Sequence, residues 1–310
     1  MSWFFIALIG PFLYAVTNHI DKFILDKYFK AGEVGAVVLF SALFSVVALP
    51  IIYLIEPGVF SVSWGSKIGL AVNGSLNIVS LILYLNALRD DEASTVVPFL
   101  QTTPIFGFIL GYFLLGETIG TKEILASLVI LAGTTIISLE LNGGRIRFKK
   151  RVAILMTLSS FLYATIGVIF KMIALNVGFW LSIFWALSGH VLIGVLLFLL
   201  IRTYRKQFLK VFKVNRAAVL AASSINEIFF IAAEGVTAYA TLLAPIALVM
   251  IINSLQPIFV FLIGIILTLF FPKLGNESMA RNDLMQKILA IGIITIGAYL
   301  LNVAHSHGQL

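Results

Sequence analysis

Long apolar runs fill this chain from end to end and leave little room for anything but a membrane domain. Of the 310 residues, 60% are hydrophobic and 11% are charged, against roughly 25% charged residues in soluble domains. A run of about 18 or more apolar residues is long enough to cross a bilayer as a helix. We expect ten transmembrane helices, at 3–20, 34–54, 68–88, 94–116, 123–141, 152–172, 177–201, 217–238, 240–271 and 284–304.

The second half of the chain repeats the first at a nearly fixed offset. Three short motifs return in order: Phe-Leu-Tyr-Ala at 12–15 and 161–164, Ser-Xaa-Asn at 75–77 and 224–226, and Pro-Ile-Phe at 104–106 and 257–259. The predicted fold is therefore an all-α polytopic membrane protein whose ten helices form two inverted five-helix repeats. We place these repeats at 1–141 and 152–310, joined by a basic cytoplasmic linker at 142–151. Repeats that enclose a site at their interface are typical of secondary transporters.

Basic residues are distributed unequally between the two sides of the predicted helices. Of the 21 Lys and Arg residues, 18 follow odd-numbered runs, and only Lys67, Lys122 and Lys171 lie on the other side. The positive-inside rule then predicts cytoplasmic odd-numbered loops and both termini outside, in a multi-pass protein of the plasma (inner) membrane. The basic stretch at 202–216 could bind nucleic acid, but contact with anionic lipid headgroups is favoured. We therefore expect membrane lipids as partners, and no nucleic acid.

The fourth and fifth runs carry a recognisable set of motifs. Ala-Ser-Thr-Val-Val-Pro at 93–98 leads to Thr-Pro-Ile-Phe at 103–106 and Leu-Leu-Gly-Glu at 114–117, and a helix with Ala132-Gly133 follows. This resembles the EamA type of the drug/metabolite transporter superfamily, over essentially the whole chain. The resemblance implies inverted halves around a central cavity, small organic substrates, and exchange or proton coupling. The second copy departs from it by having Phe-Phe-Pro-Lys at 270–273 in place of Gly-Glu, and family members are often drawn with cytoplasmic termini.

The most informative charged residue is Glu227, which lies near the middle of its apolar run. A charge at that depth costs roughly 2.5–3.5 kcal/mol, so the carboxyl group must face water, find a partner or stay protonated. Glu227 and the mid-span His190 are our candidates for proton coupling. The alternatives are a protonated Glu227 that only fixes helix packing, and a His190 that is bonded to a backbone carbonyl. Glu227 shares one helical stripe with Asn226 and Glu234. We expect Glu234, near the end of its run, to be a solvated or interfacial charge.

Buried amides and aromatic rings supply the remaining candidates for substrate binding. A buried amide needs hydrogen-bond partners, which a substrate or a neighbouring helix can provide. Tyrosine and tryptophan can donate to a ligand or simply pack. The predicted substrate-binding set is Glu227, Asn226, Asn77, Asn73, Gln101, Gln256, Tyr14, Tyr163 and Trp185.

Prolines and two lysines are candidates for gates. Proline removes a backbone donor and bends a membrane helix, which suits a moving element. Lys22 and Lys171 are repeat-related and could gate opposite faces, although snorkelling to the headgroups is the favoured role. The predicted gate or kink set is Pro98, Pro104, Pro245, Pro257, Lys22 and Lys171.

The function predicted from these patterns is secondary active transport of a small organic metabolite or drug-like compound by alternating access. A flippase for a lipid-linked substrate and a non-transporting sensor or assembly subunit remain alternatives. We find no metalloprotease, serine-hydrolase or phosphate-loop motif, so we do not expect an enzyme, and we expect no cofactor or metal. The chain contains no cysteine, which excludes disulfides and thiolate-bound metals. Gly107 and Gly111 allow close packing within one chain or a homodimer, so both a monomer and a homodimer stay open.

Overall fold

The computed structural model describes residues 3–28, 34–90, 99–138, 150–211, 216–271 and 281–308, and every regular element in them is helical. The first half contains α1 (Trp3–Tyr28), α2 (Val34–Phe44), η1 (Ser45–Val47), α3 (Ala48–Ile55), η2 (Pro57–Phe60), α4 (Trp64–Asp90), α6 (Thr103–Leu110), η3 (Gly111–Leu115) and α7 (Thr121–Ser138). The second half contains α8 (Lys150–Val177), α9 (Phe179–Leu200), α10 (Arg202–Val211), α11 (Arg216–Leu243), α12 (Ile246–Asn253), α13 (Gln256–Phe270) and α14 (Arg281–Gly308).

Eight segments of the described chain are long and apolar enough to cross a membrane. They coincide with eight of the ten expected runs. The other two are shorter: the fourth run is represented by the apolar helix Thr103–Leu115, and the fifth by α7. The all-helical, multi-pass character is therefore confirmed, whereas the count of ten helices and their inverted arrangement stay predictions.

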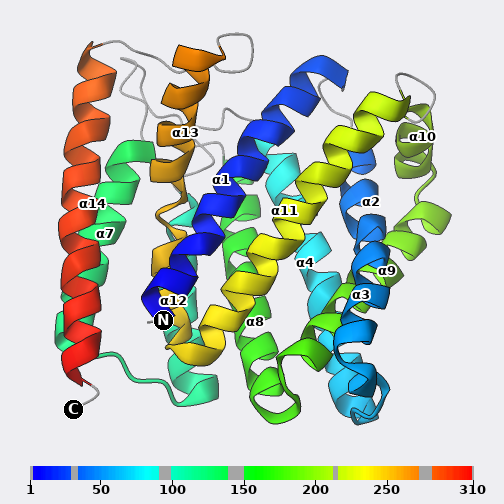
Figure 1. Ribbon diagram of the computed structural model, residues 1–310, viewed down its shortest axis with the longest axis horizontal. Coiled ribbons are helices and arrows are strands. Elements are labelled where there is room, and N and C mark those ends of the chain that lie inside the picture. The colour runs from blue at the N-terminus through cyan, green and yellow to red at the C-terminus, as the bar shows by residue number, and fades with distance from the viewer. Residues whose placement is uncertain are drawn as a thin grey trace.

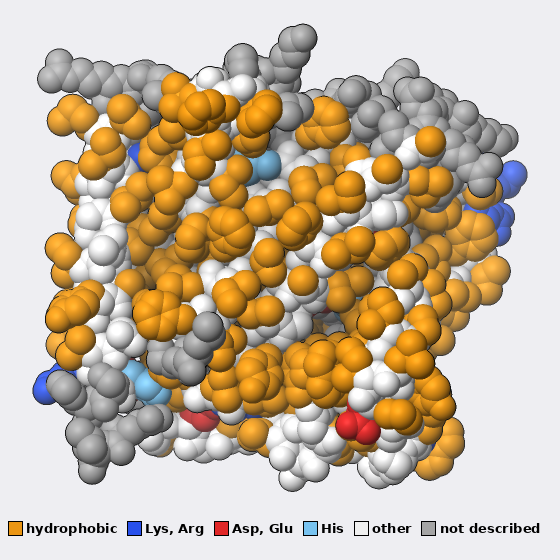
Figure 2. Space-filling view, in the orientation of Figure 1, with side chains coloured by type: hydrophobic (Ala, Val, Ile, Leu, Met, Phe, Trp, Pro, Cys, Tyr) orange, Lys and Arg blue, Asp and Glu red, His pale blue; other side chains and the backbone are white. Residues whose placement is uncertain are grey.

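Large apolar side chains cover the outside of the molecule. Leu54, Phe113 and Leu200 are 80%, 77% and 78% exposed, and Figure 2 shows hydrophobic side chains across the middle of the face, with the charged ones near its edges. Such a surface would be unfavourable in water, because apolar surface that stays exposed loses the stabilisation of about 25 cal/mol per Å² that burial would provide. Such a surface is suited to contact with lipid tails, as expected for an integral membrane protein.

Prolines divide the expected ninth helix. The span expected over 240–271 is present as one membrane-crossing segment at Ile246–Phe270, but its limits and continuity differ. Helix α11 continues to Leu243, Pro245 caps α12, and a turn at 254–255 separates α12 from α13. Pro257 lies in the first turn of α13, as its repeat counterpart Pro104 does in α6. Proline fits the first turn because no backbone N–H is required there. These prolines therefore start new helices rather than bend continuous ones.

The first helix of each half packs against a helix of the other half. In Figure 1, α1 and α11 run side by side along their lengths, and the corresponding second-half helix α8 packs against α4. Helix α4 also contacts α9, while α7 and α14 form a pair at one edge of the molecule. The centre of the bundle is therefore built from helices that alternate between the two halves.

The basic stretch after the seventh run folds as the separate helix α10. It packs against α2, and the side chain of Gln207 accepts a hydrogen bond of 2.9 Å from the backbone N–H of Gly35. Arg202, Arg205 and Lys206 lie on this helix, at the upper right edge of Figure 1. Its contact with anionic lipids stays a prediction.

Candidate functional site

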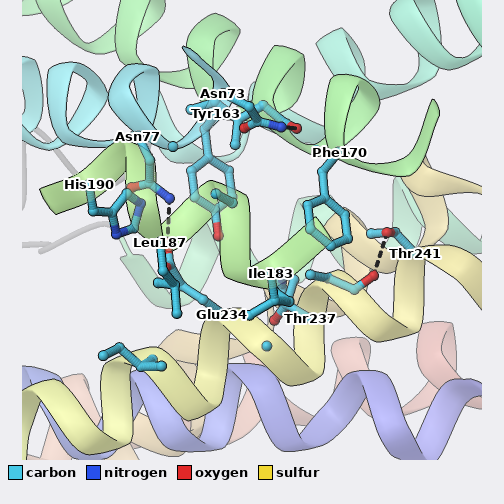
Figure 3. Close-up of a pocket in the computed structure, with 18 of the residues that line it drawn as sticks. Asn73, Asn77, Tyr163, Phe170, Ile183, Leu187, His190, Glu234, Thr237 and Thr241 are labelled. Atoms are coloured by element: carbon cyan, nitrogen blue, oxygen red, sulfur yellow. Dashed lines mark hydrogen bonds between the residues drawn. The ribbon is translucent and has the colours of Figure 1, made fainter. Parts of the chain in front are cut away.

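A cavity of about 90 Å³ lies between the halves, at the centre of the bundle. Its walls come from α1, α4, α8, α9, α11 and α12, so each half contributes (Figure 3). Most lining atoms are apolar. The polar side chains in the wall are Tyr14, Asn73, Asn77, Tyr163, His190, Glu234, Thr237, Thr241 and Asn253.

Two repeat-related tyrosines meet in the cavity wall. The hydroxyl oxygens of Tyr14 on α1 and Tyr163 on α8 are 3.3 Å apart, within hydrogen-bond distance. Because the two residues occupy equivalent positions in the halves, their contact marks the place where the halves face each other. Phe230 packs edge-on against Tyr14, with the ring centres 5.8 Å apart.

Glu234 is part of this wall, which corrects our expectation of an interfacial charge. Its carboxylate accepts a hydrogen bond from the side-chain amide of Asn77 on α4, and Figure 3 shows the two side chains facing each other. The apolar run ends at 238, which suggested the membrane surface, but α11 continues to Leu243. That extra helical turn places Glu234 farther from the helix end than the sequence indicated.

Two further polar residues of the predicted set line the cavity. The amide of Asn73 donates to the backbone carbonyl of Ile166 over 2.9 Å. Nδ1 of His190 lies 3.2 Å from the hydroxyl of Ser45. Both contacts join helices of different halves, so these side chains also hold α4 to α8 and α2–α3 to α9.

Glu227 and Asn226 are buried but do not line the cavity. The carboxylate of Glu227 accepts a hydrogen bond of 2.9 Å from the hydroxyl of Ser41 on α2. The amide of Asn226 donates to Asp21 on α1 over 2.7 Å. The structure therefore does not bring the repeat-related pair Asn77 and Asn226 together around one site.

Lys171 forms a buried ion pair, so snorkelling to the membrane surface is wrong for this lysine. Its ammonium group lies 2.5 Å from Glu117 Oε1 and donates to the carbonyl of Ala244 over 2.7 Å. The other oxygen of Glu117 accepts a hydrogen bond of 2.8 Å from the backbone N–H of Ile246. Glu117 and Lys171 thus satisfy the backbone on both sides of the break between α11 and α12.

The remaining predicted residues lie away from the cavity. Gln101 accepts a hydrogen bond from Thr134, and the indole of Trp185 donates to the carbonyl of Val59. Gln256 begins α13 and is not among the lining residues. Pro98 and the side chain of Lys22 fall outside the described residues.

The sequence did not reveal the contacts or positions of three residues that matter for the site. In the sequence, Glu117 is noticeable only as part of the Gly-Glu motif. Lys171 could have pointed to it, because a lysine within a membrane helix that has no acidic residue nearby in the sequence needs a partner elsewhere. Asn253 lines the cavity, and its side-chain nitrogen is buried without a hydrogen-bond partner among the described residues. Ser41 is an ordinary residue in an apolar helix, and nothing in the sequence connects it with Glu227.

Metal binding finds no support in the described part of the chain. No group of three or more His, Cys, Asp or Glu residues there is arranged to hold an ion.

Residues 1–139 match the EamA-like transporter family. This match extends over the first half of the chain. The matched family lies within the drug/metabolite transporter superfamily, so the resemblance drawn from the fourth and fifth runs is confirmed for these residues. The EamA match covers α1 to α7, which include the Gly116-Glu117 motif whose carboxylate holds Lys171.

Solved structures agree on the fold. Matches were found with 28 chains, and one crystal structure of a protein gives a TM-score of 0.62 at 13% identity, over 97% of this chain and 95% of the other. At that identity the likeness concerns the fold alone. No curated protein matches the chain.

Proposed function

We propose that this protein is a secondary active transporter that carries a small organic metabolite through the central cavity by alternating access. The observation that carries the proposal is the cavity between the halves, where Tyr14 and Tyr163 meet. Sites at the interface of repeated halves are the general arrangement of secondary carriers. The EamA match of the first half supports the same class of function.

The polar contacts around the cavity support rearrangement of the halves. Hydrogen bonds between membrane helices contribute about 0.6 kcal/mol each on average. Contacts such as Asn73 to Ile166 can therefore break on one side and form on the other at little cost. Glu227 is our candidate for proton coupling, because it is buried beside Ser41 and has no Lys or Arg partner among the described residues.

Blocking the cavity tests the proposal. An added Cβ at Gly235, in the cavity wall, meets no atom within 4 Å. A Gly235→Val substitution should therefore fit the fold but fill space that the substrate needs. Gly292→Val on α14 is the matched control, since Gly292 also has open space and does not line the cavity.

The measurement is flux in proteoliposomes with a panel of labelled metabolites. We expect Gly235→Val to reduce flux at least about tenfold, which corresponds to roughly 1.4 kcal/mol in the rate barrier, and Gly292→Val to keep it. Equal flux in both variants would mean that transport does not pass through this cavity. A wild-type protein that moves no compound of the panel and no labelled lipid would contradict the transporter proposal itself.

A further inference from the structure

The acidic groups near the cavity lack basic partners among the residues that the structure describes. Asp21, Glu227 and Glu234 are held by neutral donors, namely the side chains of Asn226, Ser41 and Asn77. The buried lysine of the described bundle, Lys171, pairs with Glu117 instead. Ionisable groups in a membrane interior normally face the bundle interior or a cavity and pair with one another. The region around α1 and α11 therefore has an excess of potential negative charge that the described protein does not balance.

Glu234 is the member of this group that faces the cavity. Among the lining residues that the structure describes it is the one acid, and none of them is Lys or Arg. The rings of Tyr14, Tyr163 and Phe170 line the same space. Aromatic faces attract ammonium groups when water is excluded. A carboxylate among aromatic rings is therefore a site for an organic cation rather than for an anion.

Asn253 supplies a second point of recognition. Its Oδ1 atom is 3.5 Å from the hydroxyl of Thr237, while its buried Nδ2 atom has no acceptor among the described residues. Thr237 lies three residues after Glu234 on α11, which is about 4.5 Å along the helix axis. A ligand that reaches both groups must therefore carry its ammonium nitrogen and a hydrogen-bond acceptor only a few bonds apart.

The cavity also limits the size of the ligand. Its volume is about 90 Å³, and a cavity of about 150 Å³ is known to accommodate benzene. A compound with only a few heavy atoms fits this space. Drug-sized ligands occupy pockets of about 300–1,000 Å³.

We propose that the cavity binds a small organic amine, with its ammonium group at Glu234 and an oxygen acceptor at the Asn253 amide. The proposal rests on the proposed function only in taking the cavity as the place where the substrate binds. Amino alcohols with two or three carbons between nitrogen and oxygen have the required size and spacing.

Binding to the purified protein in detergent tests the site without any need for transport. The probe is 3-amino-1-propanol, and the readouts are isothermal calorimetry and the thermal shift. Two matched compounds test the contribution of each functional group of the probe. In 1,3-propanediol a hydroxyl replaces the ammonium group, and in n-butylamine a methyl replaces the hydroxyl. We expect binding in the order aminopropanol, butylamine, propanediol, with propanediol at least about tenfold weaker than aminopropanol because the charged contact is lost.

Two substitutions separate the cavity site from the general acidity of the region. Glu234→Gln should weaken aminopropanol binding at least about tenfold. Asp21→Asn removes a carboxylate on α1 that accepts a hydrogen bond from Asn226 outside the cavity, and should retain binding in detergent. Asn253→Leu should remove the advantage of aminopropanol over butylamine.

The outcomes distinguish the site from the transport function. Binding of propanediol as strong as that of aminopropanol would overturn the site, and this comparison needs only the wild-type protein. Equal losses in Glu234→Gln and Asp21→Asn, or no binding of aminopropanol or butylamine, would overturn it as well. Amine binding without flux in proteoliposomes would support the amine site and contradict the transporter proposal. Flux of a compound that is not an amine, if Gly235→Val reduces it, would support the transporter proposal and contradict the amine site.

Discussion

The centre and the edge of this bundle hold their helices together in different ways. At the centre, helices of the two halves meet through polar side chains, such as the Tyr14–Tyr163 and Asn77–Glu234 pairs. At the edge, the middle of the α7–α14 pair is packed through glycines: an added Cβ at Gly133 would lie 2.6 Å from Ile294, and one at Gly297 would lie 2.8 Å from Ile130. Small residues let backbones approach closely in membranes. Hydrogen bonds can exchange partners, whereas close packing fixes one geometry. Close packing also joins α4 to α9 at the centre, where an added Cβ at Gly74 or Gly189 would collide with the backbone of Ala186 or Ala71. We therefore expect motion at the polar contacts of the centre and rigidity wherever glycines pack closely, including the edge.

The largest expected effect concerns the ion pair that joins the halves. Lys171→Met would leave Glu117 as a buried carboxylate without its cation, beside the α11–α12 break. Removing one partner of a buried pair costs about 3–5 kcal/mol. We expect a loss of that size in the free energy of unfolding, measured by denaturation in detergent.

The control is the double substitution Lys171→Met with Glu117→Leu. Replacing both charges by apolar groups is often neutral, so the double variant should recover most of the loss. If Lys171→Met alone has the stability of the wild type, the ion pair does not hold the centre together.

A smaller effect is expected at the edge. Gly133→Val would push a side chain into Ile294 and toward the carbonyl of Ala290. Overpacking of this kind costs about 1–3 kcal/mol. Flux per folded molecule should stay unchanged, because Gly133 does not line the cavity.

Denaturation and proteoliposome flux, measured on the same preparation, check this expectation. Gly292→Val, on the same helix pair but in open space, should leave both quantities at the wild-type level. A Gly133→Val protein with normal stability but impaired flux would reverse the proposed division between a rigid edge and a mobile centre.

The smallest effect is expected for Tyr163→Phe. It removes one hydroxyl contact between the halves, and such contacts average about 0.6 kcal/mol in membranes. The change should hardly alter stability but should shift the balance between inward-facing and outward-facing states. Differential labelling of the purified protein from the two sides of a liposome measures that balance, with Tyr299→Phe, 68% exposed on α14, as the control. A loss above about 2 kcal/mol would show that the contact is structural rather than adjustable.

Several properties follow from the sequence alone because they depend on composition and local pattern. Apolar runs long enough for a bilayer predict membrane helices whatever their neighbours are, and eight of them are found as such in the described chain. The repeated motifs singled out Tyr14 and Tyr163, whose hydroxyl groups meet in the structure, and the Gly-Glu motif indicated the EamA family. The position of helix ends was less predictable, since Pro245 and Pro257 start new helices that an apolar run does not reveal.

Only the tertiary structure decided which polar groups face the cavity. Glu227 and Glu234 are seven residues apart on one face of α11, so helical periodicity treats them alike. Their neighbours differ: Ser41 of α2 covers Glu227, whereas Asn77 of α4 meets Glu234 in the cavity wall. In the same way, the pairing of Lys171 with Glu117 depends on how α8 packs against the end of η3. The sequence determined that this chain lies in a membrane as two related halves, and the packing of those halves determined which carboxylate faces the cavity, because that choice depends on neighbours distant in the chain.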